Sequence, residues 1–256
     1  MRITTILCAS ILITCGCSSH APAQTKTPPA ARITEITVKG VVALTRASII
    51  TSSGLAVGQP CTQAGLDTAA KQLRELGVFG FGAKDPADAV KVSSEVKAKK
   101  ARIIIQVIEN PVVKSIEFNS AGPVNPGDLM AAMQTRAGSI LDLHKIQHDL
   151  TAVHDAYEEA GYQASIGDEV GVKDGVLTIP VTVSKIRQMS LAGLRRRDAE
   201  DILKLIKSKE GTYYNIKQVK EDLVALAKTG YFREVEPKFS FPSPGMVDLT
   251  ITVRER

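Results

Sequence analysis

The sequence predicts an α+β protein of three small tandem domains, each with a three-stranded mixed sheet covered by two helices. The first observation is a repeat of glycine spacings along the chain. Three sets share it: Gly40, Gly58 and Gly77; Gly122, Gly138 and Gly161; and Gly193, Gly211 and Gly230. The outer sets have spacings of 18 and 19 residues, and the middle set has 16 and 23. One unit is therefore expected three times, with two changed intervals in the middle copy.

The second observation is an apolar stripe in front of the last glycine of each set. The positions eleven and four residues before that glycine are apolar or aromatic in every copy: Leu66 and Leu73, Leu150 and Tyr157, and Val219 and Leu226. Residues at this spacing lie on one face of a helix. Because glycine readily adopts the left-handed conformation found at helix ends, each long helix is expected to end there.

A shorter helix and flanking strands complete each unit. The expected short helices are 47–52, 128–134 and 198–207, with Thr45 and Asp128 as caps of the first two. Strand-like runs precede them, in "ITEITVKG", "VVKSIEFNSAG" and "IRQMSLAG". A last strand closes each unit, at 102–109, 176–183 and 247–255. The first and last strands are expected to pair side by side, and the units are 33–110, 111–184 and 185–256.

Residues 1–23 are predicted to be a secretory signal peptide. An apolar run from 3 to 13 follows Arg2 and is too short to span a bilayer. Two processing sites fit the small residues that follow: cleavage before Gln24, or lipoprotein cleavage with a lipid on Cys17. The sequence leaves this choice open. Residues 24–32 are interpreted as a flexible leader.

Charge and cysteine content narrow the function classes. The net charge is only +5, and the basic clusters around Lys99 and at Arg195–Arg197 have no interleaved aromatic residues. These clusters are expected to be solvated surface, so no nucleic-acid partner is predicted. Three of the four cysteines lie in the signal region. Only Cys61 is left in the domains, where no intrachain disulfide is expected.

Pro237 interrupts the strand-like run "FREVEPKFSF". Proline has no backbone donor and is tolerated on an outer strand, so the middle strand of each unit is expected to be a sheet edge. An edge offers free main-chain groups to an extended polypeptide. The predicted docking residues are Gln163, Ala164, Ser165, Ile166, Glu169 and Val170 in copy two, with Val235 and Phe239 in copy three. In the third copy the proline and charges are equally consistent with an edge protected against self-association.

The sequence offers little that resembles catalytic chemistry. His144 and His148 are four residues apart on the second long helix, but Asp155 lies about 10 Å further along its axis. A metal site there is not expected, because too few ligands converge. Glu158 and Glu159 are adjacent rather than opposed across a cleft. No phosphate-binding loop or nucleophile elbow is present, so neither an enzyme nor a cofactor is predicted.

Short motifs recur in one order within the units. They are "SGLAVGQP" or "SKEGTYYN" between the helices, "GVFG" or "GYFREVEP" after the second helix, and "VIEN" or "VRER" at the end. This order resembles the POTRA (polypeptide-transport-associated) domain. Tandem copies after a signal resemble the periplasmic arm of BamA-type outer-membrane protein assembly factors. The second copy departs most, with Ser184 in place of the terminal glutamate and Gln163 in place of an aromatic residue.

The resemblance implies a periplasmic scaffold, associated with the outer membrane, that receives unfolded outer-membrane polypeptides. Its implied partners are an outer-membrane β-barrel or assembly lipoproteins, and membrane association would come through such a partner or a lipid on Cys17. Family members continue into a β-barrel, whereas this sequence stops at Arg256. Either a barrel-less protein or a truncated arm is therefore expected. A division-type or secretion-type scaffold and, among enzymes, a hydrolase are the alternatives.

Overall fold

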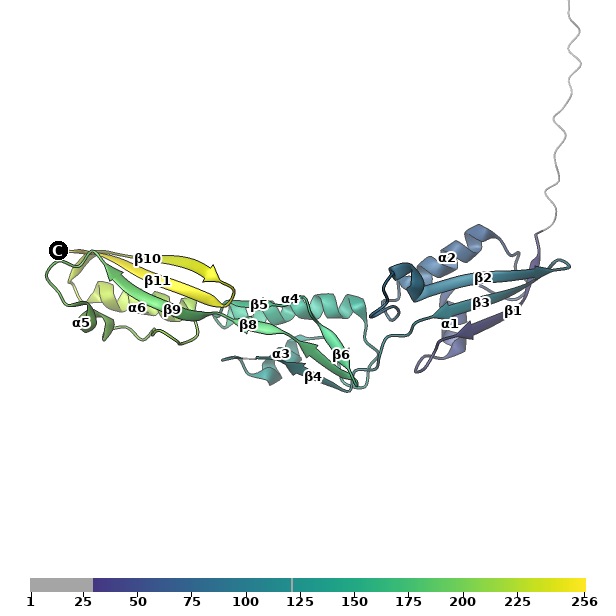
Figure 1. Cartoon of the computed structure of the whole chain (residues 1–256), viewed down its shortest axis with the longest axis horizontal. Helices are drawn as coiled ribbons and strands as arrows, with labels where there is room; N and C mark the ends of the chain where they lie inside the picture. Colours follow the sequence, from purple (N-terminus) through teal and green to yellow (C-terminus); the bar gives the residue numbers. More distant parts are fainter. Residues whose placement is uncertain (1–29, 121) are drawn as a thin grey trace, which may run out of the picture.

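The computed structural model describes residues 30–120 and 122–256, which form three α+β domains in an elongated row (Figure 1). Each domain has its own cluster of buried apolar side chains. The predicted fold class is confirmed. The expected signal peptide with Cys17, and residues 24–29 of the leader, lie outside the described residues. Within the described ranges, every helix is too short or too polar to cross a membrane.

Domain 1 has a three-stranded sheet and two helices. Its elements are β1 (Arg32–Lys39), α1 (Arg46–Ser52), α2 (Gln63–Arg74), a 3-10 turn η1 (Pro86–Ala89), β2 (Val90–Lys97) and β3 (Lys100–Val107). The central strand β3 runs parallel to β1 and antiparallel to β2. Ile49 of α1 and Leu73 of α2 belong to the same buried cluster as Ile103 and Ile105 of β3. As expected, the first and last strands are neighbours and the middle strand is an edge.

Domain 3 repeats this plan with longer strands. Its elements are β9 (Lys185–Ala192), α5 (Ala199–Leu203), α6 (Ile216–Lys228), β10 (Phe232–Ser243) and β11 (Met246–Glu255). The central strand β11 is parallel to β9 and antiparallel to β10. Pro237 pairs with Ile251 on the edge strand β10, where a missing donor breaks no ladder on the outer side. Every second residue of β11 from Val247 to Val253 is buried.

Domain 2 follows the plan with interrupted strands. Its elements are β4 (Ser115–Phe118), α3 (Pro126–Ala132), α4 (Leu143–Glu159), β5 (Ala164–Ile166), β6 (Gly171–Lys173), β7 (Val176–Ile179) and β8 (Val181–Val183). One sheet has the order β4-β7-β6, and β5 pairs with β8 alone. The middle strand of this unit was expected to run through the predicted docking residues, from Gln163 to Val170, and this expectation is wrong, because residues 167–170 lie outside any strand. Pro180 divides the last strand into β7 and β8.

Two helix ends also differ from expectation. Asp128 does not cap the short helix of domain 2; Asn125 does, and its side chain accepts a hydrogen bond from Gly127 N at 2.9 Å. Pro126 then occupies the first turn, where its missing donor costs nothing. In domain 3, α5 ends at Leu203 rather than 207. Thr45 does cap α1, as predicted.

A buried aspartate anchors the turn after the short helix in domains 2 and 3. Asp149, which is completely buried, accepts hydrogen bonds from the amides of Gln134 and Thr135, the latter at 3.0 Å. Asp222 accepts from the amides that follow α5, at 2.8 and 2.9 Å. Both aspartates lie seven residues after the cap of the long helix. In domain 1 this position is Ala69, and the turn is satisfied locally.

A glutamate at the end of the last strand holds the first loop in domains 1 and 3. The carboxylate of Glu109 accepts hydrogen bonds from the amides of Val42, Ala43 and Leu44, at 2.6 to 3.0 Å. Glu255 accepts from the amide of Arg196 at 3.2 Å. The recurring "VIEN" and "VRER" endings thus have a structural role, because a carboxylate satisfies loop amides that have no ladder partner.

Joint 1 connects the end of α2 to the start of α4. The amide of Leu143, the first residue of α4, donates to the carbonyl oxygen of Gly77 at 2.8 Å. The side chain of Asn110 donates to the same oxygen at 3.1 Å. A Cβ on Gly77 would lie 2.6 Å from Oδ1 of Asp142, the cap of α4. The cap therefore rests directly on the glycine.

Joint 2 connects the end of α4 to the start of α6 in the same way. The amide of Ile216, the first residue of α6, donates to the carbonyl oxygen of Gly161 at 2.8 Å. A Cβ on Gly161 would lie 2.6 Å from Oδ1 of Asn215, the cap of α6. Each joint pairs an orphan acceptor at one helix end with an orphan donor at the next. The long helices α2, α4 and α6 consequently follow one another along the row (Figure 1).

Candidate functional site

The strand β5 of domain 2 has one unpaired side. It pairs only with β8, in the register Ala164 to Val183 and Ile166 to Val181. The hydrogen bonds that flank this pair run from Ser184 N to Gln163 O at 2.8 Å and from Gly167 N to Pro180 O at 2.9 Å. Bonded residues alternate in an antiparallel ladder, so the main-chain groups of Ala164 and Ile166 point away from β8. These amides and carbonyls form the free edge.

A groove lies between α4 and the segment that begins with β5. Its volume is about 560 Å³. Its apolar lining comes from Leu150 of α4 with Ile166 and Val170. Its polar lining comes from Gln147, Thr151, His154, Gly167 and Asp168. A mixed lining of this kind suits the side chains of an extended peptide, which alternate between a buried and a solvated face.

Two further hollows continue along β5. One, of about 440 Å³, lies between the end of α4 and Tyr214 and Ile216 of domain 3, and includes Gln163 and Ala164. The other, of about 460 Å³, lies between β5 and the tip of the β10–β11 hairpin. That tip carries Phe241, whose surface is 57% exposed. The three hollows therefore border β5 along its whole length.

The edge residues predicted in domain 2 lie in two different settings. Gln163 and Ser165 are exposed, Ile166 is half-buried, and Ala164 is buried in the second core. Glu169 and Val170 lie after the end of β5, and Val170 lines the groove. Ala164, Ser165 and Ile166 form β5, Gln163 precedes the strand, and Glu169 and Val170 follow it.

Val235 and Phe239 of domain 3 face inward. Both pack against the third core, and Phe239 makes an edge-to-face contact with Tyr214 at a centroid distance of 5.5 Å. Their side chains are therefore engaged by the domain itself. The outer edge of β10 is formed by its main chain, and the side chains of Glu234, Glu236 and Lys238 beside it are exposed. Charged residues of this kind commonly protect an edge strand.

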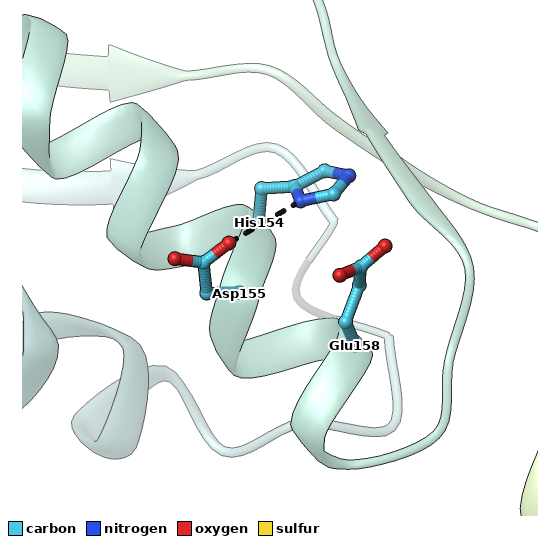
Figure 2. A group of neighbouring side chains, drawn as sticks. All are labelled: His154, Asp155 and Glu158. Atoms are coloured by element: carbon cyan, nitrogen blue, oxygen red, sulfur yellow. Dashed lines mark ion pairs between the residues drawn. The ribbon is translucent and has the colours of Figure 1, made fainter.

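His154, which lines the groove, forms a polar cluster with Asp155 and Glu158 (Figure 2). One potential ligand atom from each residue lies within 4.8 Å of the others, and Nδ1 of His154 is 3.7 Å from Oδ1 of Asp155. All three come from α4, and both carboxylates are exposed. Bound zinc holds its ligand atoms at roughly 2.0–2.2 Å from the metal, which requires closer convergence than this. We therefore describe the cluster as a polar group of side chains on the surface of α4.

His144 lies elsewhere, at joint 1. Its Nε2 is 3.2 Å from the carbonyl oxygen of Glu75. Asp155 lies near His154 and Glu158, and not near the pair of His144 and His148.

The sequence signal for the cluster of His154, Asp155 and Glu158 was the spacing of four residues between His154 and Glu158. The signal for the joints was a capping residue, Asp142 or Asn215, four residues after the middle glycine of its set.

Comparisons with known proteins agree with this architecture. A family model described as "Surface antigen variable number repeat", POTRA, matches residues 184–256. The N-terminal domain of Omp85 from the cyanobacterium Thermosynechococcus elongatus has a similar structure, with a TM-score of 0.74 and 20% identity over 88% of this chain and 97% of its own. The POTRA1-3 structure of Omp85 from Anabaena has a TM-score of 0.61 and 22% identity, over 88% and 95% of the two chains.

Two curated relatives match more of the sequence than the family model does. "Outer membrane protein assembly factor BamA" of Nitratidesulfovibrio vulgaris is 23% identical over 184 residues, 68% of this chain. "Outer envelope protein 80, chloroplastic" of Arabidopsis thaliana is 21% identical over 168 residues, 60% of this chain. In both cases the match spans only 22% of the relative's own length. Residues 184–256 match the POTRA family model, and the described chain as a whole has the fold of tandem POTRA domains and resembles the POTRA arrays of BamA and Omp85 proteins.

Proposed function

We propose that this chain is a non-enzymatic scaffold for outer-membrane protein assembly or transport, which binds extended polypeptides by strand addition at β5. The observation that carries the proposal is the unpaired outer side of β5, where the main chain of half-buried Ile166 lies beside an open groove. An added strand would satisfy those groups whatever its sequence, and the groove would take its alternate side chains. Such a site suits unfolded polypeptides of many sequences.

The relatives support a location and a class of partner for this scaffold. The named role of BamA as an outer-membrane protein assembly factor supports a periplasmic site of action at the outer membrane. Unfolded outer-membrane polypeptides are the proposed clients, and an outer-membrane β-barrel or assembly lipoproteins are the proposed partners. Attachment through a lipid on Cys17 is part of the same proposal.

The buried carboxylates support a binding role over a catalytic one. Within residues 30–120 and 122–256, the aspartates buried from solvent are Asp149 and Asp222. Both are saturated by main-chain amides. A general acid or base needs access to a reacting group, and these side chains lack it.

Photocrosslinking from the edge tests the proposal. A benzophenone amino acid replaces Ser165, which is solvent-exposed on β5. The variant is mixed with an outer-membrane β-barrel protein that has been denatured in urea and diluted into lipid-free buffer, and is then irradiated. The control position is Gln106, which is exposed on β3, a strand paired on both sides. We expect capture of the unfolded protein from Ser165 to exceed capture from Gln106 several-fold. Equal capture from both positions would contradict strand addition.

A pair of variants separates the main chain from the side chain. Ile166→Pro removes the outward amide while keeping an extended backbone, and Ile166→Ala removes a similar apolar contact but keeps the amide. We expect the proline variant to lose crosslinking at Ser165 and the alanine variant to retain most of it. Equal losses in both would mean that the Ile166 side chain, rather than the edge, binds the client.

A further inference from the structure

The two joints show what the glycine at the end of a long helix contacts when a neighbour is present. Gly77 and Gly161 are buried, and each carbonyl accepts the first amide of the next long helix. At joint 2 a residue of each partner also forms an isolated antiparallel bridge, Tyr162 to Asn215. The repeated occupant is the capped N-terminus of a helix.

The corresponding end of α6 is open in the described structure. Gly230 is exposed, has a positive φ of 74° like the other two, and has no atom within 4 Å of the position a Cβ would take. Among the hydrogen bonds of the described residues, none ends on its carbonyl oxygen. The neighbouring Tyr231 is 40% exposed, and its ring lies 3.6 Å from the guanidinium of Arg197.

The open end has the local geometry of joint 1. Arg256 N donates to Tyr231 O at 3.1 Å, just as Asn110 N donates to Val78 O at 3.0 Å. The strand after the helix end is thus pinned in the same way at both places. The carbonyl of Gly230 is therefore presented as that of Gly77 is, but without the donor that joint 1 supplies.

The start of α2 is the matching free element. Its cap, Thr62, uses its hydroxyl oxygen to accept from Gly65 N at 3.1 Å and its carbonyl to accept from Leu66 N. No described hydrogen bond begins at the amide of Gln63, the first residue of the helix. Leu143 and Ile216, at the same helix position, donate across the joints. In the described chain, α2 is the long helix with an unused first amide.

We propose that two copies of this chain associate head to tail, with the start of α2 in one copy docked on the end of α6 in the other. Gln63 N would donate to Gly230 O, and Thr62 would lie against Tyr231 as Asn215 lies against Tyr162. The positive end of one helix dipole meets the negative end of another, so the two ends are complementary in charge. The proposal is independent of strand addition at β5.

The association is expected to be weak and open-ended. Inside the chain a short linker holds each joint closed at high effective concentration, and two separate copies lack that advantage. Because the two contacting surfaces differ, the contact does not close on itself and a third copy can add to a dimer. Trapping by a disulfide is therefore the appropriate measurement.

The trap uses the geometry of joint 2. Bridged residues in an antiparallel pair have Cα atoms about 4.5–5.5 Å apart, within the range that a disulfide spans. Thr62→Cys and Tyr231→Cys are introduced into the full chain with its four native cysteines changed to serine. The mismatched control combines Thr62→Cys with Val224→Cys, which is exposed on α6. Both double-cysteine variants carry Thr62→Cys, so any destabilisation from losing the α2 cap affects the two equally. Tyr162→Cys with Asn215→Cys is the intrachain positive control.

We expect mild oxidation to give a ladder of linked dimers and larger species, about tenfold above the mismatched pair, given the distance limits of a disulfide. Adding Gln63→Pro removes the donor while proline remains acceptable at the first helical position, and should bring the ladder down to the mismatched level. Gln63→Ala keeps the amide and should leave the ladder unchanged. A ladder no stronger than that of the mismatched pair, or one insensitive to Gln63→Pro, would overturn the proposal.

Discussion

Gly77, Gly161 and Gly230 have the same backbone conformation in different surroundings, which separates two roles of one residue type. All three have φ between 71° and 88°, where a side chain is strained. Only at Gly77 and Gly161 would a Cβ also collide with the cap of the next helix. All three glycines therefore end a long helix, but only two of them also form a contact between domains.

Replacing these glycines by alanine should distinguish the two roles. Gly230→Ala should lower the free energy of unfolding of domain 3 by about 1–2 kcal/mol, the cost of a left-handed non-glycine residue. Gly161→Ala should carry a similar cost in domain 2 and also open joint 2, because Asn215 must move. Hydrogen exchange of the Ile216 amide, which donates to Gly161 O, measures the opening. Faster exchange is expected only in Gly161→Ala, and an unchanged rate would show that the joint tolerates the Cβ.

Asp222 should be among the most sensitive polar residues of domain 3. It is buried and accepts two main-chain hydrogen bonds, so Asp222→Asn replaces an acceptor with a partial donor facing amides. We expect a loss of about 1.5–3 kcal/mol, as for hydrogen bonds to a charged group. The control is Asp201→Asn, an exposed residue paired with Lys204, with an expected change below about 0.5 kcal/mol. Urea denaturation followed by circular dichroism compares the two, and equal midpoints would contradict this assignment.

Tyr157 should make domain 2 sensitive to alkaline pH. Burial raises the pKa of this side chain from 10.0 to about 12, and the nearby Tyr213 adds to the increase. The unfolded chain therefore loses the Tyr157 proton near pH 10, whereas the folded domain keeps it until about pH 12. Its contribution to stability is complete below pH 10 and is lost as the pH rises from 10 to 12.

A pH titration of unfolding followed by circular dichroism tests this linkage. Tyr157→Phe removes the ionising hydroxyl and should weaken the pH dependence of the unfolding free energy of domain 2 between pH 10 and 12. Tyr231→Phe, at an exposed residue of domain 3, should leave that slope as it is. If both variants keep the slope of the parent chain, Tyr157 does not control the alkaline transition.

At the scale of elements, periodicity predicted the long helices and the strand order. The ends of the strands in domain 2 were predicted less well, because they depend on a proline and a glycine. Three apolar stripes gave α2, α4 and α6, and Pro237 gave the edge position of β10. Domain 2 was predicted less well, because the alternation in 163–170 continues through Gly167 although pairing stops there. Pro180, opposite Gly167, cannot donate to a ladder, so both strands break at the same level. The groove beside β5 depends on that break and on α4, and has no local sequence signature.

At the scale of the whole molecule, the row of domains depends on contacts between residues far apart in sequence. Leu143 and Gly77 are 66 positions apart, and Ile216 and Gly161 are 55 apart. Local sequence patterns predicted that Gly77 and Gly161 end a helix and that Leu143 and Ile216 lie near the start of one. They did not predict that these helix ends contact each other. The pairing follows from the short linkers, which leave each new domain within reach of the preceding helix, and from the complementary orphan groups at those ends.

Proline at the first position of each long helix should test whether these bonds set the shape of the row. Proline is favoured at that position, and within the main chain it removes only the amide that donates across the joint. The preceding caps already have the extended backbone that proline requires: φ and ψ are −107° and 117° at Asp142, −125° and 114° at Asn215, and −125° and 150° at Thr62. Leu143→Pro and Ile216→Pro should therefore keep α4 and α6 and loosen joints 1 and 2. Gln63→Pro makes the same change at α2, which takes part at its start in no joint among residues 30–120 and 122–256.

Distances between spin labels measure the effect in dilute samples, where single copies dominate. Labels on Thr68 and Gln147 span joint 1, and labels on Gln147 and Lys220 span joint 2; all three residues are exposed on the long helices. We expect Leu143→Pro to broaden only the first distance distribution, Ile216→Pro only the second, and Gln63→Pro neither. Narrow distributions in all three variants would mean that the linkers and the remaining contacts, such as Asn110 at joint 1 and the Tyr162 to Asn215 bridge at joint 2, fix the domains without these bonds. Each proline removes a main-chain donor that the helix itself does not use, so a change in width reports on the joint. Ile216→Pro also removes a side chain that packs against the third core, which makes Leu143→Pro the cleaner of the two tests.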